Sequence, residues 1–122
     1  MFKRGGIYTV NLPHSDTREE PEVCPCLVVS NNLSNEYSPV ATIIPLSFTS
    51  LEKIYDFETF LPAVGSGLQR DAKISSHILI TIDKANVVGD RLGFLTKTLM
   101  TQVDKALCFQ LGIDETPGSV KG

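Results

Sequence analysis

The feature that most constrains this chain is a succession of short stretches rich in β-branched and aromatic residues, each ended by turn-forming residues. Such stretches are typical of the strands of an antiparallel sheet. They occupy residues 7–12, 24–30, 40–46 and 72–82, with weaker examples at 55–61 and 91–95. We expect the longest of them, 72–82, to form one bent strand. Loops or turns are expected where Pro, Asn, Ser and Gly gather, at residues 13–22, 31–39 and 65–71.

Only the C-terminal part of the chain departs from this pattern. Thr96 is suited to cap the N-terminus of a helix, and Gly112 is suited to end it. Between them, apolar residues recur at helical spacing: Leu99, Val103, Ala106, Leu107 and Leu111. The sequence therefore predicts a mainly β (α+β) domain, a small and partly closed antiparallel barrel with one C-terminal helix packed on it.

Size and charge restrict the kinds of function that the chain can have. A chain of 122 residues is long enough for one domain with a core but too short for two. The net charge of −3 argues against a protein that holds nucleic acid by general neutralisation of phosphates. Any contact with RNA would need a local patch or a groove between subunits. With no Trp, three Tyr and six Phe, stacking of bases on an aromatic surface is not the expected binding mode.

The sequence shows no pattern of a signal peptide and no apolar run of the ~20 residues that span a bilayer, so we expect a cytoplasmic protein with no membrane contact. An odd number of cysteines, three, is a poor disulfide framework. Cys24 and Cys26 would share one strand face, but a zinc site needs further ligands in a second motif. His14 and His77 do not supply one, and we expect neither a metal nor a cofactor.

Several fragments, taken together, resemble the MazF/PemK family of toxins. Residues 4–8 resemble the family's opening Arg-Gly-Asp/Glu-Ile-Tyr/Trp, and residues 25–31 resemble part of its Arg-Pro-Val-Leu-Val-Ile-Ser-Asn. Residues 44–47 are similar to its Pro-Ile/Val-Thr corner, and residues 81–84 to the end of its Gln-Ile-Arg-Thr-Ile-Asp-Lys stretch. No single fragment is specific, but they keep the family's order and spacing from about residue 3 to residue 113.

This resemblance implies a toxin domain at residues 1–113 and a flexible tail at 114–122. The implied fold is a small SH3-like antiparallel β-barrel, the CcdB/MazF plasmid-maintenance toxin fold, with a C-terminal helix. The implied function is that of the toxin of a type II toxin–antitoxin system, a homodimer that holds single-stranded RNA in a groove and is blocked by the peptide tail of its cognate antitoxin. The implied reaction is metal-independent endoribonuclease cleavage that leaves 2′,3′-cyclic phosphate ends.

Two residues stand at the family's catalytic positions. Ser47 replaces a usual threonine and keeps a hydroxyl; its structural alternative is a strand-end serine bonded to its own backbone. His77 stands where relatives carry Asp or Glu, next to Ile78 in place of a common Gln, and an imidazole suits proton transfer near neutral pH. Its structural alternative is a surface histidine without a catalytic role.

Four further residues are candidates for contacts with substrate or antitoxin. Cys24 stands where the family has a catalytic arginine, and losing one such donor costs about 3–4 kcal/mol of transition-state stabilisation; the thiol otherwise serves as a small buried apolar group. In the loop at 13–22, Arg18 is a possible replacement cation and Glu19 matches a recurrent glutamate. Lys73 matches a basic position. For these three residues the alternative is an ordinary solvated charge.

The altered positions leave other functions open. Cys24 and Ile78 support a catalytically silent family member that binds RNA or a peptide as a dimer without cutting. A CcdB-like toxin that binds a protein target such as a topoisomerase would need terminal residues that have no counterpart in this sequence. Cleavage of RNA is the favoured hypothesis.

Overall fold

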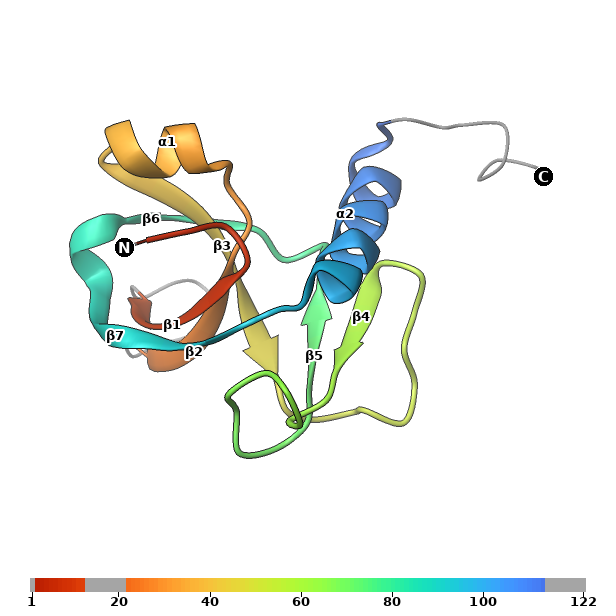
Figure 1. The fold of residues 1–122 in the computed structure, drawn as a ribbon. Coiled ribbons are helices and arrows are strands. Elements are labelled where there is room, and N and C mark those ends of the chain that lie inside the picture. Colours follow the sequence, from red (N-terminus) through yellow and green to blue (C-terminus); the bar gives the residue numbers. More distant parts are fainter. Residues whose placement is uncertain (1, 13–21, 114–122) are drawn as a thin grey trace.

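The structure is a computed structural model that describes residues 2–12 and 22–113. Its strands form one antiparallel sheet with two α-helices outside it (Figure 1). In chain order the elements are β1 (Gly6–Leu12), β2 (Glu22–Val28), α1 (Asn32–Tyr37), β3 (Val40–Ser47), β4 (Glu58–Leu61), β5 (Ala72–Ser75), β6 (Ile80–Asp83), the 3-10 turn η1 (Lys84–Asn86), β7 (Val87–Phe94) and α2 (Lys97–Leu111).

Strand β3 is the centre of the sheet because it pairs with three other strands. The strand order is β4-β5-β3-β2-β1-β7, and β6 also pairs with β3. The first half of β3, at residues 40–43, lies against β6, whereas its end at Leu46 and Ser47 lies against β5. The sheet therefore bends across β3, and the smaller β4–β5 portion turns away from the rolled β1–β2–β6–β7 portion (Figure 1). The result is an open sheet with the shape of a barrel.

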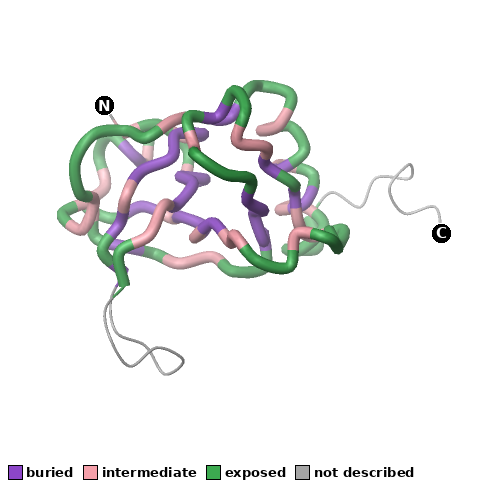
Figure 2. Tube along the Cα trace, turned by 90° about the horizontal axis from the view of Figure 1, so that it is seen from below, coloured by how far each residue is buried: buried purple, intermediate pink, exposed green. Residues whose placement is uncertain are grey.

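The two faces of the bent sheet bury two separate apolar clusters (Figure 2). Alternation along a strand sends neighbouring side chains to opposite faces. In β1, Ile7 joins the cluster beneath α2, while Tyr8, Val10 and Leu12 join the cluster enclosed by β2, β3 and β6. The core thus follows from the β-branched pattern read in the sequence.

Helix α2 has the boundaries that the sequence predicts. The Thr96 hydroxyl accepts a hydrogen bond from the Leu99 N–H at 3.2 Å, which caps the first turn. Gly112 takes a left-handed conformation with φ of 69°, and its N–H bonds carbonyls of the last turn. Val103 and Ala106 are buried against the sheet. The prediction of a C-terminal helix is confirmed.

The prediction of one bent strand at 72–82 is wrong. The chain forms β5, turns at Ser76 and His77, and resumes as β6. The turn is held because the Ser76 N–H donates to the Phe57 carbonyl at 2.8 Å and the Ile78 N–H donates to the Ser75 carbonyl at 2.9 Å. This interruption lets β3 pair with β5 at one end and β6 at the other.

Four other boundaries differ from the sequence prediction, the first being that of the strand expected at 24–30, which spans Glu22–Val28. The segment expected to be only a turn at 31–39 contains α1, whose first turn is capped by the Asn31 side chain accepting from Ser34 N–H. The weak strand expected at 55–61 begins only at Glu58, and the strand expected at 91–95 begins at Val87. Within the described residues, no helix is long and apolar enough to cross a membrane.

The turn at residues 64–67 lies against the outer edge of β7. The Phe94 N–H donates to the Ser66 carbonyl at 3.2 Å, on the side of β7 away from β1. The backbones approach so closely that a Cβ on Gly93 would lie 1.7 Å from the same carbonyl oxygen. A Cβ on Gly67 would lie 2.5 Å from the Leu92 carbonyl oxygen. Glycine is therefore required sterically at both positions.

Candidate functional site

Ser47 lies at the end of β3, where the strand leads into the connection to β4. It is half-buried. Its hydroxyl donates to the Thr49 carbonyl at 3.4 Å and accepts from the Thr49 N–H at 3.5 Å. This is the self-bonded arrangement of a strand-end serine, but both distances are long for hydrogen bonds. The hydroxyl is therefore held weakly and can exchange these partners for a ligand.

Three residues selected from the sequence lie on adjacent strands. Lys73 on β5 is directly opposite Ser47 on β3. On the other side of β3, the pairing with β2 ends with Cys26 opposite Pro45, and Cys24 lies two residues beyond this pair on β2. Opposite residues share a sheet face. The fold thus places Ser47 and Lys73 opposite each other and Cys24 on the strand at the other side of β3.

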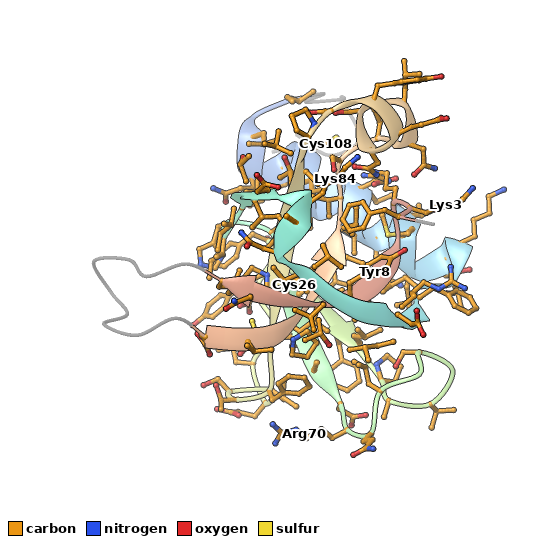
Figure 3. The ribbon with its side chains drawn as sticks, turned by 90° about the vertical axis from the view of Figure 1, so that its left-hand side faces the viewer. Lys3, Tyr8, Cys26, Arg70, Lys84 and Cys108 are labelled. Carbon is orange, nitrogen blue, oxygen red and sulfur yellow. The ribbon has the colours of Figure 1, made fainter. Side chains whose placement is uncertain are left out.

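Cys24 does not supply a fixed positive charge near Ser47. It is half-buried and packs against the cluster that contains Cys26, whose sulfur lies 3.8 Å from the Cys24 sulfur. Figure 3 shows Cys26 within the strands of the rolled part of the sheet. The position fits the alternative of a small apolar side chain, and a thiol lacks the fixed charge and forked donors of the arginine that the resemblance leads one to expect there.

Lys73 does carry a charge, but its ammonium is already occupied. The Nζ atom donates to the Ser50 carbonyl at 3.0 Å, to the Lys53 carbonyl at 3.4 Å, and to the Glu58 carboxylate, each of whose oxygens is 3.2 Å away. The Lys73 and Glu58 side chains are only 9% and 5% exposed. The expectation that Lys73 contacts substrate therefore does not fit this arrangement. Its role in the structure is to hold the segment between β3 and β4.

Glu58 completes this buried pair and was not selected from the sequence. Burial raises the pKa of its carboxyl group. Hydrogen bonds from the Tyr55 N–H and the Ser75 hydroxyl, together with the Lys73 ammonium, lower the pKa by more than burial raises it, so the pKa lies below its ordinary value. The Ser75 hydroxyl donates at 2.8 Å and the Tyr55 N–H at 3.1 Å. Glu58 is therefore ionised at neutral pH. Glu58 is identified by the pairing of β4 with β5, which places it opposite Ser75.

His77 lies in the turn after β5 and is exposed. Its ring meets the edge of Phe57, with ring centroids 4.4 Å apart. Ser47 is opposite Lys73; Ser75 is two residues, about 7 Å, farther along β5, and His77 follows beyond it. The expected pair of Ser47 and His77 is therefore not formed within one protomer.

The structure describes an additional cation near the end of β3 but none of the remaining candidates from the loop at 13–22. His14, Arg18 and Glu19 lie outside the described residues. Arg70, which sequence reasoning missed, places its guanidinium carbon 4.3 Å from the ring centroid of Phe48, the residue that follows Ser47. Figure 3 shows Arg70 at one extremity of the molecule, at the opposite end from Cys108. Arg70 therefore brings an exposed cation to the end of β3.

Arg4, at the start of the resemblance, has a structural role. Its Nε donates to the Val29 carbonyl at 2.7 Å, and its guanidinium forms an ion pair with Asp104 on α2 at 2.7 Å. These contacts link the N-terminal segment to the C-terminal helix. Among the described residues, no group of three or more His, Cys, Asp or Glu side chains is placed to hold a metal ion.

Comparisons of sequence place this chain among known toxins. Residues 3–111 match the family described as PemK-like, MazF-like toxin of type II toxin–antitoxin system. The chain is 29% identical over 113 residues to endoribonuclease EndoA of Bacillus subtilis (strain 168), covering 93% of this chain and 97% of EndoA. It is 28% identical to endoribonuclease MazF9 of Mycobacterium tuberculosis, covering 93% of this chain and 98% of MazF9.

Comparisons of structure agree. An endoribonuclease from a mycobacterial species, solved in complex with its cognate antitoxin, superposes with a TM-score of 0.75 at 23% identity, covering 92% of this chain and 96% of that one. MazF from Deinococcus radiodurans also gives 0.75, at 20% identity, with 92% and 97% covered. The predicted barrel fold is confirmed. Since the family match covers nearly the whole chain, this protein belongs to the family of PemK-like, MazF-like toxins of type II toxin–antitoxin systems.

Proposed function

We propose that this protein cleaves single-stranded RNA as the toxin of its toxin–antitoxin pair. The observation that carries the proposal is the match to two proteins named endoribonucleases, EndoA and MazF9, over almost their entire lengths. The weakly held hydroxyl of Ser47 at the end of β3 is the local feature that supports it. The relatives thus favour cleavage over the alternative of a family member that only binds.

The reaction we propose needs no metal. The RNA 2′-hydroxyl attacks the adjacent phosphorus, its proton passes to a base, and the 5′ oxygen leaves with a proton from an acid; the product end is a 2′,3′-cyclic phosphate. Such a reaction needs proton transfer and a donor or cation on the phosphorane oxygens. Ser47 supplies the donor once its hydroxyl turns from Thr49 to a phosphate oxygen. Arg70, close to the same strand end, is the described cation best placed to assist.

We further propose that the working unit is a homodimer. In one protomer His77 lies away from Ser47, so His77 would reach the reacting phosphate from the partner subunit, facing Ser47 across a groove. Arg18 and Glu19 are the candidates for further contacts from the loop at 13–22. The cognate antitoxin is proposed to block this groove, as suggested by the relatives solved as complexes with their antitoxins. The pair would act in the cytoplasm.

The test is cleavage of long unstructured RNAs by the purified protein in the presence of EDTA. We expect fragments that end in 2′,3′-cyclic phosphate, and a strongly reduced rate for the Ser47→Ala variant, whereas Ser47→Thr should remain active. If RNAs of varied sequence stay intact while the protein is folded, the proposal fails. In that case a gain of cleavage in Cys24→Arg would identify a barrel that lost its cation and works by binding.

A further inference from the structure

A row of stacked side chains is exposed where β4 begins and β5 ends. The rings of Tyr55 and Phe57 stack with centroids 5.4 Å apart and planes 5° apart. His77 meets the edge of Phe57 at 4.4 Å. The Lys53 ammonium lies 5.1 Å from the Tyr55 ring centroid. We call these four residues the aromatic row; they are contributed by the β3–β4 connection and by the turn after β5.

The aromatic row is built on rigid support. The Glu58 carboxylate accepts from the Tyr55 N–H at 3.1 Å, and the Tyr55 carbonyl accepts from the Glu58 N–H at 2.8 Å. The buried Lys73 ammonium binds the Lys53 carbonyl, and the Phe57 carbonyl accepts from the Ser76 N–H. The backbone at Tyr55 and Phe57 is thus fixed, whereas Lys53 is held only by a long contact of 3.4 Å. A fixed ring loses little conformational entropy when a ligand stacks on it.

The outer face of Tyr55 is accessible. Tyr55 is 48% exposed, and the group over its ring is a flexible, exposed lysine. We propose that this face is the stacking site for an unpaired base of single-stranded RNA, an inference that rests on the proposed function and names one of its substrate contacts. The base takes the place of the Lys53 ammonium over the ring, and the displaced ammonium is left beside the phosphate of the same nucleotide.

Charge favours a base over a phosphate as the group recognised here. The protein carries a net charge of −3, and in the sequence Glu52 adjoins Lys53 and Asp56 adjoins Tyr55. Neutralisation of phosphates therefore contributes little at this place. Stacking on an aromatic ring does not depend on net charge, and it accepts any base. The expectation that bases would not stack on this protein came from the small number of aromatic residues, but the fold gathers Tyr55, Phe57 and His77 together.

The test measures binding separately from cleavage. The probe is a labelled, unstructured 2′-O-methyl RNA of about 12 nucleotides, which lacks the attacking hydroxyl and stays intact whether or not the protein is an enzyme. Affinity is measured by fluorescence anisotropy for wild type, Tyr55→Leu and Tyr55→Phe. We expect Tyr55→Leu to bind about 5- to 150-fold more weakly, the range that corresponds to loss of one stacked base. Tyr55→Phe keeps the ring and should keep the affinity.

A control is Tyr37→Leu, which removes a tyrosine from α1 that is more exposed than Tyr55 and lies outside the aromatic row. It should leave binding unchanged, and all variants should melt at the wild-type temperature because neither tyrosine is buried. The dependence of binding on salt should keep its slope in Tyr55→Leu, since a base contact rather than a phosphate contact is lost.

Several results would overturn the inference. Equal affinity of Tyr55→Leu and wild type would do so, as would failure of the folded wild type to bind the probe. A change from dimer to monomer in Tyr55→Leu by sedimentation would assign the ring to contact between copies. Loss of antitoxin binding with RNA binding intact would assign it to the protein partner. If wild type binds the probe but cleaves no RNA, and Tyr55→Leu loses this binding, the stacking site stands while the proposed reaction fails.

Discussion

Replacing Lys73 with Met tests whether the buried ion pair organises the connection between β3 and β4. The methionine side chain fills similar space but removes the ammonium that binds two backbone carbonyls and both oxygens of Glu58. Glu58 would then remain as a carboxylate that is 5% exposed and keeps only the donors from Tyr55 and Ser75. Removal of one partner from a buried pair leaves an uncompensated charge.

The expected cost follows from these contacts. Breaking a buried pair by removing one partner costs about 3–5 kcal/mol of unfolding free energy. Since Glu58 keeps two hydrogen-bond donors, we expect the lower end, about 3 kcal/mol, which lowers the melting temperature of a domain of this size by roughly 10–15 °C. The double variant Lys73→Met, Glu58→Gln removes both charges and should recover about 1 kcal/mol or more.

Urea unfolding at neutral pH, followed by circular dichroism, measures these differences. Lys105→Met is the matched control because Lys105 is an exposed lysine on α2, and it should change stability by less than about 0.5 kcal/mol. The reasoning is refuted if Lys73→Met costs less than about 1 kcal/mol, the range of an exposed pair, or if the double variant is less stable than Lys73→Met alone.

Three other predictions follow from the described contacts. Because folding lowers the pKa of Glu58, its ionised form stabilises the protein above the ordinary value of 4.5, so the stability difference between wild type and Glu58→Gln should shrink as pH falls below that value; acid-to-neutral urea titrations measure it, and a constant difference contradicts it. Ser47→Ala should lower the rate of RNA cleavage about 100-fold without changing the melting temperature, and Cys24→Arg should raise the rate of cleavage. Unchanged rates would remove both positions from the site. Gly93→Ala should cost about 3 kcal/mol because its Cβ would overlap a carbonyl oxygen, whereas Gly89→Ala, with open space but a φ of 77°, should cost about 1 kcal/mol; thermal melts that rank them the other way oppose this steric account.

The parts of the fold that depend on local chemistry could be predicted from the sequence. Helix α2 has its cap at Thr96, its apolar face and its terminating glycine at Gly112 within one short segment. The β-branched stretches at 7–12 and 40–46 likewise match β1 and β3 to within one residue. In each case the signal lies in neighbouring residues, so no knowledge of distant contacts was needed.

The break between β5 and β6 could not be found in this way. Residues 78–82 are as rich in β-branched and aliphatic side chains as the stretch before them, so the pattern indicates one strand. The turn at Ser76 is instead stabilised by the carbonyl of Phe57, which is distant along the chain. For α1 a local signal did exist, the cap at Asn31, but Leu33 and Tyr37 are both largely exposed and the segment lacks the buried apolar face that identifies a helix.

The candidate site was predictable only in part. Ser47, Cys24 and Lys73 were selected from the sequence, and the strand register places Ser47 and Lys73 directly opposite each other. The burial of Lys73 was not foreseeable, because its partner Glu58 lies 15 residues earlier in a segment that reads as loop and weak strand. The gathering of Tyr55, Phe57 and His77 depends on the same long-range pairing, which the amino-acid count does not reveal.

The close contact of the Ser66 turn with β7 has a consequence for how the protein behaves at high concentration. A bare strand margin offers a ladder of donors and acceptors on which another polypeptide can extend the sheet. In this protein the Ser66 carbonyl accepts from the Phe94 N–H at the outer edge of β7, and the absence of a side chain at Gly93 allows this close approach. A bulkier residue there would uncover part of the ladder, so fibrous or amorphous association of copies is expected in addition to the loss of stability.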